Sequence, residues 1–424
     1  MRKKILLLTL LVLIGVAFAM PSYSANGDRY AARVVKSALS LLKRDNDWTG
    51  RNRFDSQSGS REVQVPDDLI KVVAFLSDKT LRIMEAHSTD HIQVTIKGSN
   101  IIPFKIGSDT YILESDTNLS LATDLDSGTT TAGTDYYVYA VSGVTSGNAL
   151  DFVISENSTW PTTYDADTSI KIGGFHLLCA SVGTIGGHTL TGYLIGDVLP
   201  ASIWDLKHRP RSSPAGMVWS EQAGIWVDIY LASGTGASTS SVNGGTVSDT
   251  RDWLDFVDDF HAVKKQLLSD SEFQAIAAGS NEETNISGSA DPVTTGGHSD
   301  TAGRRMISNI GVEDACGAMW QWLADTSYRF DAPIGHTHSV TVSGAAETVA
   351  TSLSGTTDIP TWDYYNLPGA KGSLYRQGSY GDVKLRAGGH WNPGTDCGSR
   401  SRDAYSYRWY THTTFGGRGR SEPQ

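Results

Sequence analysis

The sequence predicts an α+β protein in which short strands dominate and helices are few. Three observations lead to this fold class. The 424 residues include 44 glycines together with many Ser and Thr, a composition typical of turns and strands. Short alternating runs, such as 136–141 and 169–174, are separated by turn residues. Apolar residues at helical spacing are found in 28–44 and 252–279.

Residues 1–24 are predicted to be a secretory signal peptide. Arg2, Lys3 and Lys4 precede an apolar run, 5–19, that is too short to span a bilayer comfortably. An uncleaved N-terminal anchor is the alternative. We therefore expect an exported protein at the cell surface or in the extracellular space, and a virion-associated protein as the alternative.

Residues 25–60 are predicted to form an amphipathic helix, 28–44, followed by a polar linker. The apolar face of the helix could pack on a partner copy or on the next domain, and binding to a membrane surface is a further alternative. We expect a homo-oligomer, of which a trimer is one form, and association with the cell envelope is open.

Residues 61–200 are predicted to be a β-rich stalk or assembly module, because short strands with regular punctuation indicate a β-sandwich or a related module. Residues 201–424 form the second predicted domain. Two strands, 217–219 and 226–230, are expected near its start. The stretch 252–279 is expected to be helical in two pieces, with Asp270 or Ser271 as the N-cap of the second.

Charge and cysteine content narrow the classes of function. A formal charge of −11 and a pI near 5.4 argue against general binding to nucleic acid. The chain has three cysteines, Cys179, Cys316 and Cys397, and an odd number in an exported protein leaves at least one thiol outside an intramolecular disulfide. Cys316 and Cys397 could pair, or could be small buried apolar residues.

The most informative segment is the C-terminal tail, 386–424. Glycines stand at both ends of a stretch crowded with Trp, Tyr, His, Arg, Ser, Thr and Asp. These residue types make contacts at interfaces, with Tyr, Trp and Arg as the usual anchors. The tail therefore has the composition of a binding surface.

Upstream of the tail, Gly311, Asp314, Gly317, Trp320 and Trp322 follow the spacing Gly-x-x-Asp-x-x-Gly-x-x-Trp-x-Trp. This run resembles the signature of the formylglycine-generating-enzyme (sulfatase-modifying-factor) branch of the C-type lectin fold. The usual signature has Asn, Val and Glu at three positions where this chain has Ala318, Met319 and Gln321. The Gly-Gly-x-Trp segment of that branch corresponds to 388–391, and its terminal Gly-Arg element to 416–418.

More closely, residues 253–424 resemble the variable proteins of diversity-generating retroelements. The resemblance implies a C-type lectin-like domain, which the β-rich module and the short N-terminal helix predicted above precede in the chain. It also implies that a reverse transcriptase rewrites adenine positions of a template, usually in Asn codons. The positions that would vary and bind the ligand are His390, Asn392, Pro393, Asp396, Asp403, Tyr405, Ser406, Tyr410, His412 and Thr414. None of them is Lys, Glu, Gln, Met or Trp, which an Asn codon rewritten at its adenines cannot encode.

The remaining tail and motif residues are expected to form a fixed frame that holds the backbone through packing and turns. Its members are Trp320, Trp322, Trp391, Arg400, Arg408, Trp409 and Arg418. The frame residues should be buried or bonded, and the variable residues should share one exposed face. The predicted function is that of a non-enzymatic display protein, an adhesin with a hypervariable surface for an unknown protein or surface ligand.

Two other classes of function remain open on the sequence. The first is a formylglycine-generating-enzyme-like catalytic domain that uses copper and a cysteine pair, for which Cys316 and Cys397 are the candidates. The second is a structural component of a phage tail or surface layer. No cofactor is expected, although a structural calcium is open, as is a metal bound by His336 and His338 at the start of a predicted β-excursion, 335–360.

Overall fold

The computed structural model describes residues 82–98, 102–142, 150–326, 383–392, 394–404 and 406–424. It also gives the backbone of strand segments at 52–54, 61–63, 327–329, 364–366, 373–375 and 381–382. The predicted signal peptide, the predicted helix at 28–44, His336, His338 and the excursion at 335–360 lie outside the described residues. In the part that is described, no helix has the length and apolar character needed to cross a membrane.

The chain divides into two compact units. The first comprises residues 1–81, 98–104 and 112–116, and contains the antiparallel hairpin β1 (Asn52–Phe54) and β2 (Arg61–Val63). The second comprises the other residues and carries every feature discussed below. Strands β5 (Ile102–Ile106) and β6 (Asp109–Leu113) each contain residues of both units.

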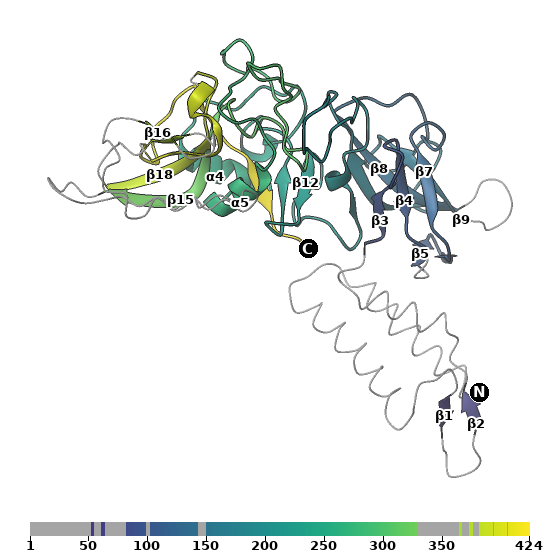
Figure 1. The fold of residues 1–424 in the computed structure, drawn as a ribbon. Helices are drawn as coiled ribbons and strands as arrows, with labels where there is room; N and C mark the ends of the chain where they lie inside the picture. Colours follow the sequence, from purple (N-terminus) through teal and green to yellow (C-terminus); the bar gives the residue numbers. More distant parts are fainter. Residues whose placement is uncertain are drawn as a thin grey trace. The chain divides into compact units, whose positions relative to one another are not determined.

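The second unit begins with two antiparallel sheets (Figure 1). One has three strands, in the order β3 (Met84–Ala86), β4 (Gln93–Ile96) and β7 (Thr117–Ser120). The other has four, in the order β11 (Trp204–Asp205), β10 (Ser169–His176), β8 (Asp135–Ser142) and β9 (Leu150–Ser155). The strand positions predicted at 136–141 and 169–174 are confirmed. The predicted domain boundary at residue 200 stays a prediction.

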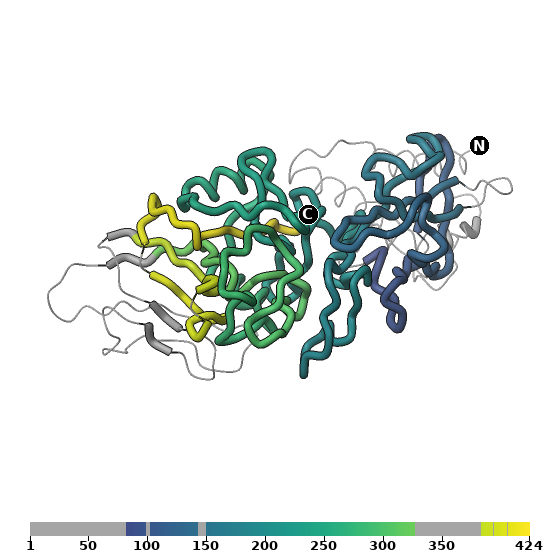
Figure 2. Tube along the Cα trace, turned by 90° about the horizontal axis from the view of Figure 1, so that it is seen from above, coloured from purple at the N-terminus to yellow at the C-terminus, as the bar shows by residue number. Residues whose placement is uncertain are grey.

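The C-terminal part of the unit begins and ends in one sheet. Its strand order is β12 (Met217–Ser220), β13 (Ile225–Asp228), β21 (Gly419–Ser421) and β14 (Gln266–Leu267), all antiparallel. Strand β21, near the end of the tail, therefore pairs with β13, whose residues come almost 200 positions earlier in the chain. In Figure 2 the yellow end of the chain accordingly runs back to the green part. This pairing fixes the end of the tail.

The two predicted helical pieces are α4 (Trp253–Ala262) and α5 (Asp270–Ile276), separated by β14. Each begins with a capping box, in which Asp252 exchanges hydrogen bonds with Asp255 and Ser269 does so with Glu272. The prediction of Asp270 or Ser271 as the second N-cap was therefore wrong by one or two residues. The Ser269 hydroxyl and the Glu272 carboxylate satisfy backbone N–H groups reciprocally at that position.

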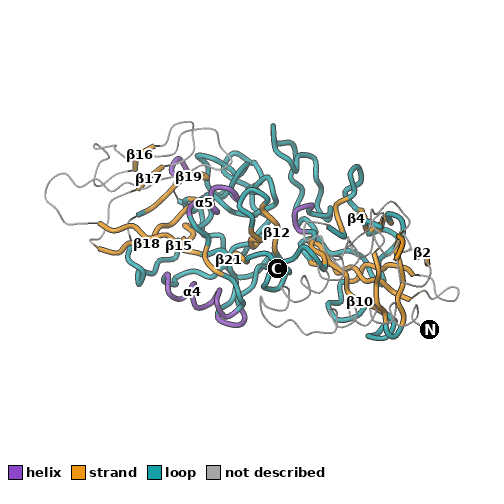
Figure 3. The backbone as a smooth tube through the Cα atoms, turned by 90° about the horizontal axis from the view of Figure 1, so that it is seen from below, coloured by secondary structure: helices purple, strands orange, loops and turns teal. Residues whose placement is uncertain are grey.

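A six-stranded sheet carries the tail. Its order is β16 (Tyr364–Asn366), β17 (Ser373–Tyr375), β19 (Gly398–Asp403), β18 (Gly381–Gly388), β15 (Trp320–Arg329) and β20 (Phe415–Gly416). In the described part of the C-terminal region, irregular stretches connect many of the helices and strands, with short 3-10 turns at η1 (Pro200–Ser202), η2 (Gly236–Ser238) and η3 (Gly394–Asp396) (Figure 3). The fold is mainly β with few helices.

The predicted pair of Trp residues lies in the core beneath this sheet. Trp320 and Trp322 pack with Phe256 and Phe260 of α4 and with Phe415 of β20, and all five side chains are buried. The shared side expected for two residues that stand two apart on a strand is confirmed. A buried aromatic cluster of this kind fixes the strand from which the tail departs and to which it returns.

Candidate ligand-binding surface

Arg418 is the central tie between the tail and the rest of the domain. Its side chain is fully buried, and its guanidinium donates to the carbonyl oxygens of Asp228 (2.9 Å), Ile229 (2.6 Å) and Glu313 (2.6 Å) and to the Gln321 side chain (2.9 Å). Burial lowers the pKa of Arg418 to about 10, so the group remains charged at neutral pH. Its predicted position in the frame agrees with this burial.

Gln321 explains one departure from the usual signature. Its side-chain oxygen accepts from Arg418 Nε at 2.9 Å, and its amide nitrogen donates to the carbonyl oxygens of Ala315 (2.9 Å) and Asp314 (3.3 Å). A carboxylate at this position could accept from the arginine but could not donate to the carbonyls. Gly311 and Gly317 have φ values of +93° and +77°, and a Cβ at Gly317 would lie 2.6 Å from the Thr284 carbonyl oxygen.

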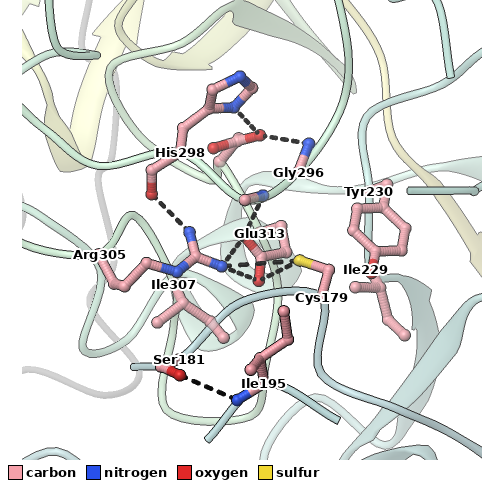
Figure 4. Close-up of polar contacts among 12 residues, drawn as sticks. Cys179, Ser181, Ile195, Ile229, Tyr230, Gly296, His298, Arg305, Ile307 and Glu313 are labelled. Carbon is pink, nitrogen blue, oxygen red and sulfur yellow. Dashed lines mark hydrogen bonds and ion pairs between the residues drawn. The ribbon is translucent and has the colours of Figure 1, made fainter. Parts of the chain in front are cut away.

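A buried polar cluster that includes Arg305, Glu313 and His298 supports the turn before β15 (Figure 4). Arg305 donates to both carboxylate oxygens of Glu313, at 2.6 and 2.7 Å, and the His298 ring lies 2.9 Å from Asp314. Burial raises the pKa of Glu313. Burial also acts to raise the pKa of Asp314, but hydrogen bonding and the charge of His298 outweigh it and lower that pKa. The cluster fixes the loop 296–298 against the turn before β15.

Strand β19 is held by two buried ion pairs. Arg386 and Asp403 face each other across β18 and β19, with 2.8 Å between the guanidinium and the carboxylate. Arg402 pairs with Asp270 at the start of α5. The Arg386 guanidinium also lies 3.5 Å from the centroid of the Phe415 ring. Ion pairs this deeply buried tolerate loss of one partner poorly, so these residues belong to the structural part of the tail.

The loop between β18 and β19, residues 389–397, is fixed at both ends. The Glu283 N–H donates to the Cys397 carbonyl oxygen at 2.8 Å, and the Asn285 side chain donates to the Trp391 carbonyl oxygen. Trp391 packs against the buried cluster that contains Met319 and Ala318. Between these fixed points Asn392 and Thr395 are exposed, whereas His390, Gly394 and Asp396 are partly exposed.

A second exposed loop, residues 407–413, is held by its backbone and by two of its rings. The Trp253 N–H donates to the Arg408 carbonyl oxygen at 2.9 Å, and the Thr250 N–H donates to the His412 carbonyl oxygen at 3.2 Å. The exposed residues of the loop are Trp409, Tyr410, Thr411, His412 and Thr413, and the rings of Tyr410 and His412 lie 5.7 and 5.5 Å from the buried Phe415 ring, between centroids. The loop thus displays side chains while its path is set by the buried elements beneath it.

The two loops approach each other above the aromatic core. The His390 ring lies 6.4 Å from the Trp320 ring, and the His412 ring lies 5.5 Å from the Phe415 ring, between ring centroids. Burial, Arg386 and His412 together lower the pKa of His390 to about 4, so His390 is neutral at physiological pH. We define the exposed face as the exposed residues of these loops together with the partly exposed His390 and Asp396, namely His390, Asn392, Thr395, Asp396, Trp409, Tyr410, Thr411, His412 and Thr413.

Five of the ten predicted variable residues lie on this face: His390, Asn392, Asp396, Tyr410 and His412. Pro393 and Tyr405 lie outside the described residues. The expectation of exposure was wrong for Asp403, Ser406 and Thr414, which are buried. Asp403 is held by its ion pair, the Ser406 carbonyl accepts from the Lys384 N–H at 3.0 Å, and the Thr414 carbonyl accepts from the Trp320 N–H at 2.9 Å.

Among the predicted frame residues, Trp320, Trp322, Arg400 and Arg418 are buried, and Trp391 and Arg408 are partly buried. The expectation was wrong for Trp409, whose side chain is 62% exposed. Its ring stacks on Tyr407, which lies at the loop surface, rather than on the core. Sequence reasoning assigned the Trp to packing because Trp is usually buried, and it also missed Thr395, Thr411 and Thr413 as exposed positions. Their position between two fixed backbone segments was the only available signal.

The cysteines do not form a catalytic pair. Cys179, Cys316 and Cys397 carry thiols rather than a disulfide, and burial raises the pKa of each. A buried thiol with a raised pKa is a poor nucleophile and a poor metal ligand. In the described ranges, no group of three or more His, Cys, Asp or Glu side chains is placed to hold a metal ion. The view of Cys316 and Cys397 as small buried residues is the one that the structure supports.

The fold and the tail define a class: a mainly β protein whose last sheet presents two loops on a buried polar and aromatic frame. Comparison with known proteins agrees with this class. Residues 84–205 match a family model described as the Mtd second domain. The chain is 26% identical to the tail fiber receptor-binding protein of Bordetella phage BPP-1 over 378 residues. This match covers 83% of this chain and 85% of the phage protein.

Solved structures show the same fold. The U1 and M1 variants of the major tropism determinant each superpose with a TM-score of 0.58 at 24% identity over 82% of this chain. The chain covers 85% and 84% of those structures, respectively. The chain therefore shares its fold with the major tropism determinant structures. The resemblance to diversity-generating retroelement variable proteins with a C-type lectin fold is confirmed, and the relatives are named for receptor binding and tropism rather than for an enzymatic activity.

Proposed function

We propose that this chain is a non-enzymatic receptor-recognition protein that binds a target on a bacterial or virion-accessible surface through the exposed face of its tail. One observation carries the proposal. The tail combines residues locked by buried bonds, such as Arg402 and Arg418, with exposed residues such as Asn392 and Thr411, whose side chains lie outside the core. Side chains of the second kind can change identity with little effect on stability.

The similarity to a tail fiber receptor-binding protein supports a location outside the cell, on a phage particle or at a cell surface. The C-terminal part, 201–424, is proposed to be the C-type lectin-like recognition domain, and 61–200 an assembly module. Oligomer formation, export and association with the envelope stay predictions. Recognition is proposed to need no cofactor, so dialysis against EDTA should leave target binding unchanged.

Binding to intact cells tests the proposal. The full chain, labelled with a fluorophore, is incubated with a panel of intact bacterial strains and compared with a variant in which Asn392, Tyr410 and His412 are each changed to Ser. We expect binding to a subset of strains and loss of that binding in the variant. The matched control replaces three exposed apolar residues outside the tail, Leu194, Ile195 and Val293, with Ser. Equal binding by the native chain and the tail variant would contradict the proposal.

The origin of the variable positions is tested on the gene itself. We expect a reverse transcriptase gene nearby and a near-copy of codons 388–416 that is rich in Asn codons. The two copies should differ only where the template has adenine. Differences at other template bases would refute diversification, although the binding function could still stand.

A further inference from the structure

Trp409 is the most exposed aromatic side chain of the tail and has no place in the core. Its side chain is 62% exposed, and its ring stacks on Tyr407 with 4.8 Å between centroids and 10° between ring planes. Tyr410, next to it, is 39% exposed. An exposed Trp loses the favourable free energy that its burial would supply, so its retention at the centre of a loop requires another explanation.

We propose that Trp409 is a constant aromatic anchor of the exposed face, and that it inserts into an apolar pocket on a folded protein partner. The proposal rests on the function proposed above and assigns to one residue a role separate from that of the exchangeable residues. The exchangeable residues select the partner, whereas Trp409 supplies the same contact to every partner. Trp cannot arise by rewriting the adenines of an Asn codon, so this position is not one that such diversification would create.

The geometry of the ring indicates a pocket on the partner. Trp409 stacks on Tyr407 and still keeps most of its side chain exposed. Sites for small molecules are concave and surround their ligand, whereas a projecting ring requires a partner that surrounds it. The parallel stack on Tyr407 also limits the ring's movement, so little side-chain entropy remains to be lost on binding.

The surroundings of the ring indicate a protein partner. Among residues 407–413 the exposed side chains are two aromatic rings, two threonine hydroxyls and one imidazole, and none is Lys, Arg, Asp or Glu. The centre of a protein interface is depleted of charge and enriched in Trp and Tyr, and such residues are the usual hot spots. Hydroxyls and amides at the rim, such as those of Thr411 and Asn392, suit the hydrogen bonds that surround a hot spot.

Two matched libraries of the full chain, displayed on yeast, test the anchor. Both are randomised at Asn392, Thr395, Thr411 and Thr413 with codons that cannot encode Trp, and they differ only by Trp409→Ala. Each is selected on streptavidin and on hen lysozyme as folded protein probes, and on mannan as a polysaccharide probe. Display level and protease resistance should be equal, because the side chain lies outside the core.

We expect protein binders to be at least about tenfold more frequent in the library that retains Trp409. In clones selected from it, Trp409→Ala should weaken binding about 30-fold or more, whereas Leu194→Ala, at a residue that is 60% exposed, should change it less than about threefold. Equal yields of protein binders from the two libraries would overturn the anchor but leave the recognition face standing. Enrichment on mannan alone would overturn the protein partner, and no binders from either library would overturn both the anchor and the recognition face.

Discussion

Replacing Arg418 with Met tests the buried tie at the end of the tail. The substitution keeps an unbranched side chain of similar reach but removes every donor. Of the four acceptors, the Ile229 carbonyl keeps a second donor in the Glu313 N–H at 2.8 Å, and the other three lose a charged donor. At about 1–3 kcal/mol for each buried acceptor that loses its donor, we expect the free energy of unfolding to fall by about 3 kcal/mol or more.

Urea denaturation followed by tryptophan fluorescence measures this loss. Arg420→Met is the matched control, because Arg420 lies two residues away and pairs with Glu272 and Glu422 near the surface. We expect the control to lose less than about 1 kcal/mol. Arg418→Lys should fall between the two, since one ammonium cannot reach four acceptors. A loss below about 1 kcal/mol for Arg418→Met would refute the conclusion that this arginine ties the tail to the domain.

Three further predictions follow from the same contacts. Asp403→Ala should destabilise the fold by about 3 kcal/mol because it leaves the buried Arg386 guanidinium without its carboxylate, and a denaturation midpoint equal to that of the native chain would count against this. Burial lowers the pKa of His298, but Asp314 and Glu313 outweigh it and raise that pKa above its ordinary value. The stabilisation is therefore fully present below about pH 6.5 and lost as pH rises through the folded pKa, so the urea midpoint should fall over that range in the native chain but not in His298→Gln. Finally, the two buried thiols, Cys316 and Cys397, should react with a thiol reagent at pH 8 only after unfolding, and rapid reaction of more than one thiol in the native protein would contradict their burial.

Local patterns were sufficient to predict much of the fold. Alternation and turn residues located β8 and β10, and helical spacing located α4 and α5. These features depend on neighbours in the sequence, which a single chain displays directly. The pairing of β21 with β13 could not be predicted in this way, because it joins segments almost 200 residues apart and the three residues of β21 are too few to carry a pattern.

The same distinction between local patterns and long-range contacts applies to the candidate site. The motif that contains Gly317 and Trp320 could be identified from its local spacing, and the expected burial of Trp320 and Trp322 is confirmed. Asp403 and Trp409 were assigned to the wrong sets because the family pattern of variable and fixed positions was mapped onto the tail residue by residue. That mapping contains neither the pairing of Asp403 with Arg386 nor the course of the loop that leaves Trp409 exposed.

The tail combines buried frame residues that do not tolerate substitution with an exposed face whose residues can be exchanged. A scan of all substitutions at residues 390–416 in the full chain, read by resistance to protease, tests it most directly. We expect Asn392, Thr395 and residues 409–413 to accept nearly every residue without loss of folding. We expect Arg402, Asp403 and Thr414 to accept almost none. Uniform tolerance along the tail, or intolerance at Asn392 and His412, would contradict it.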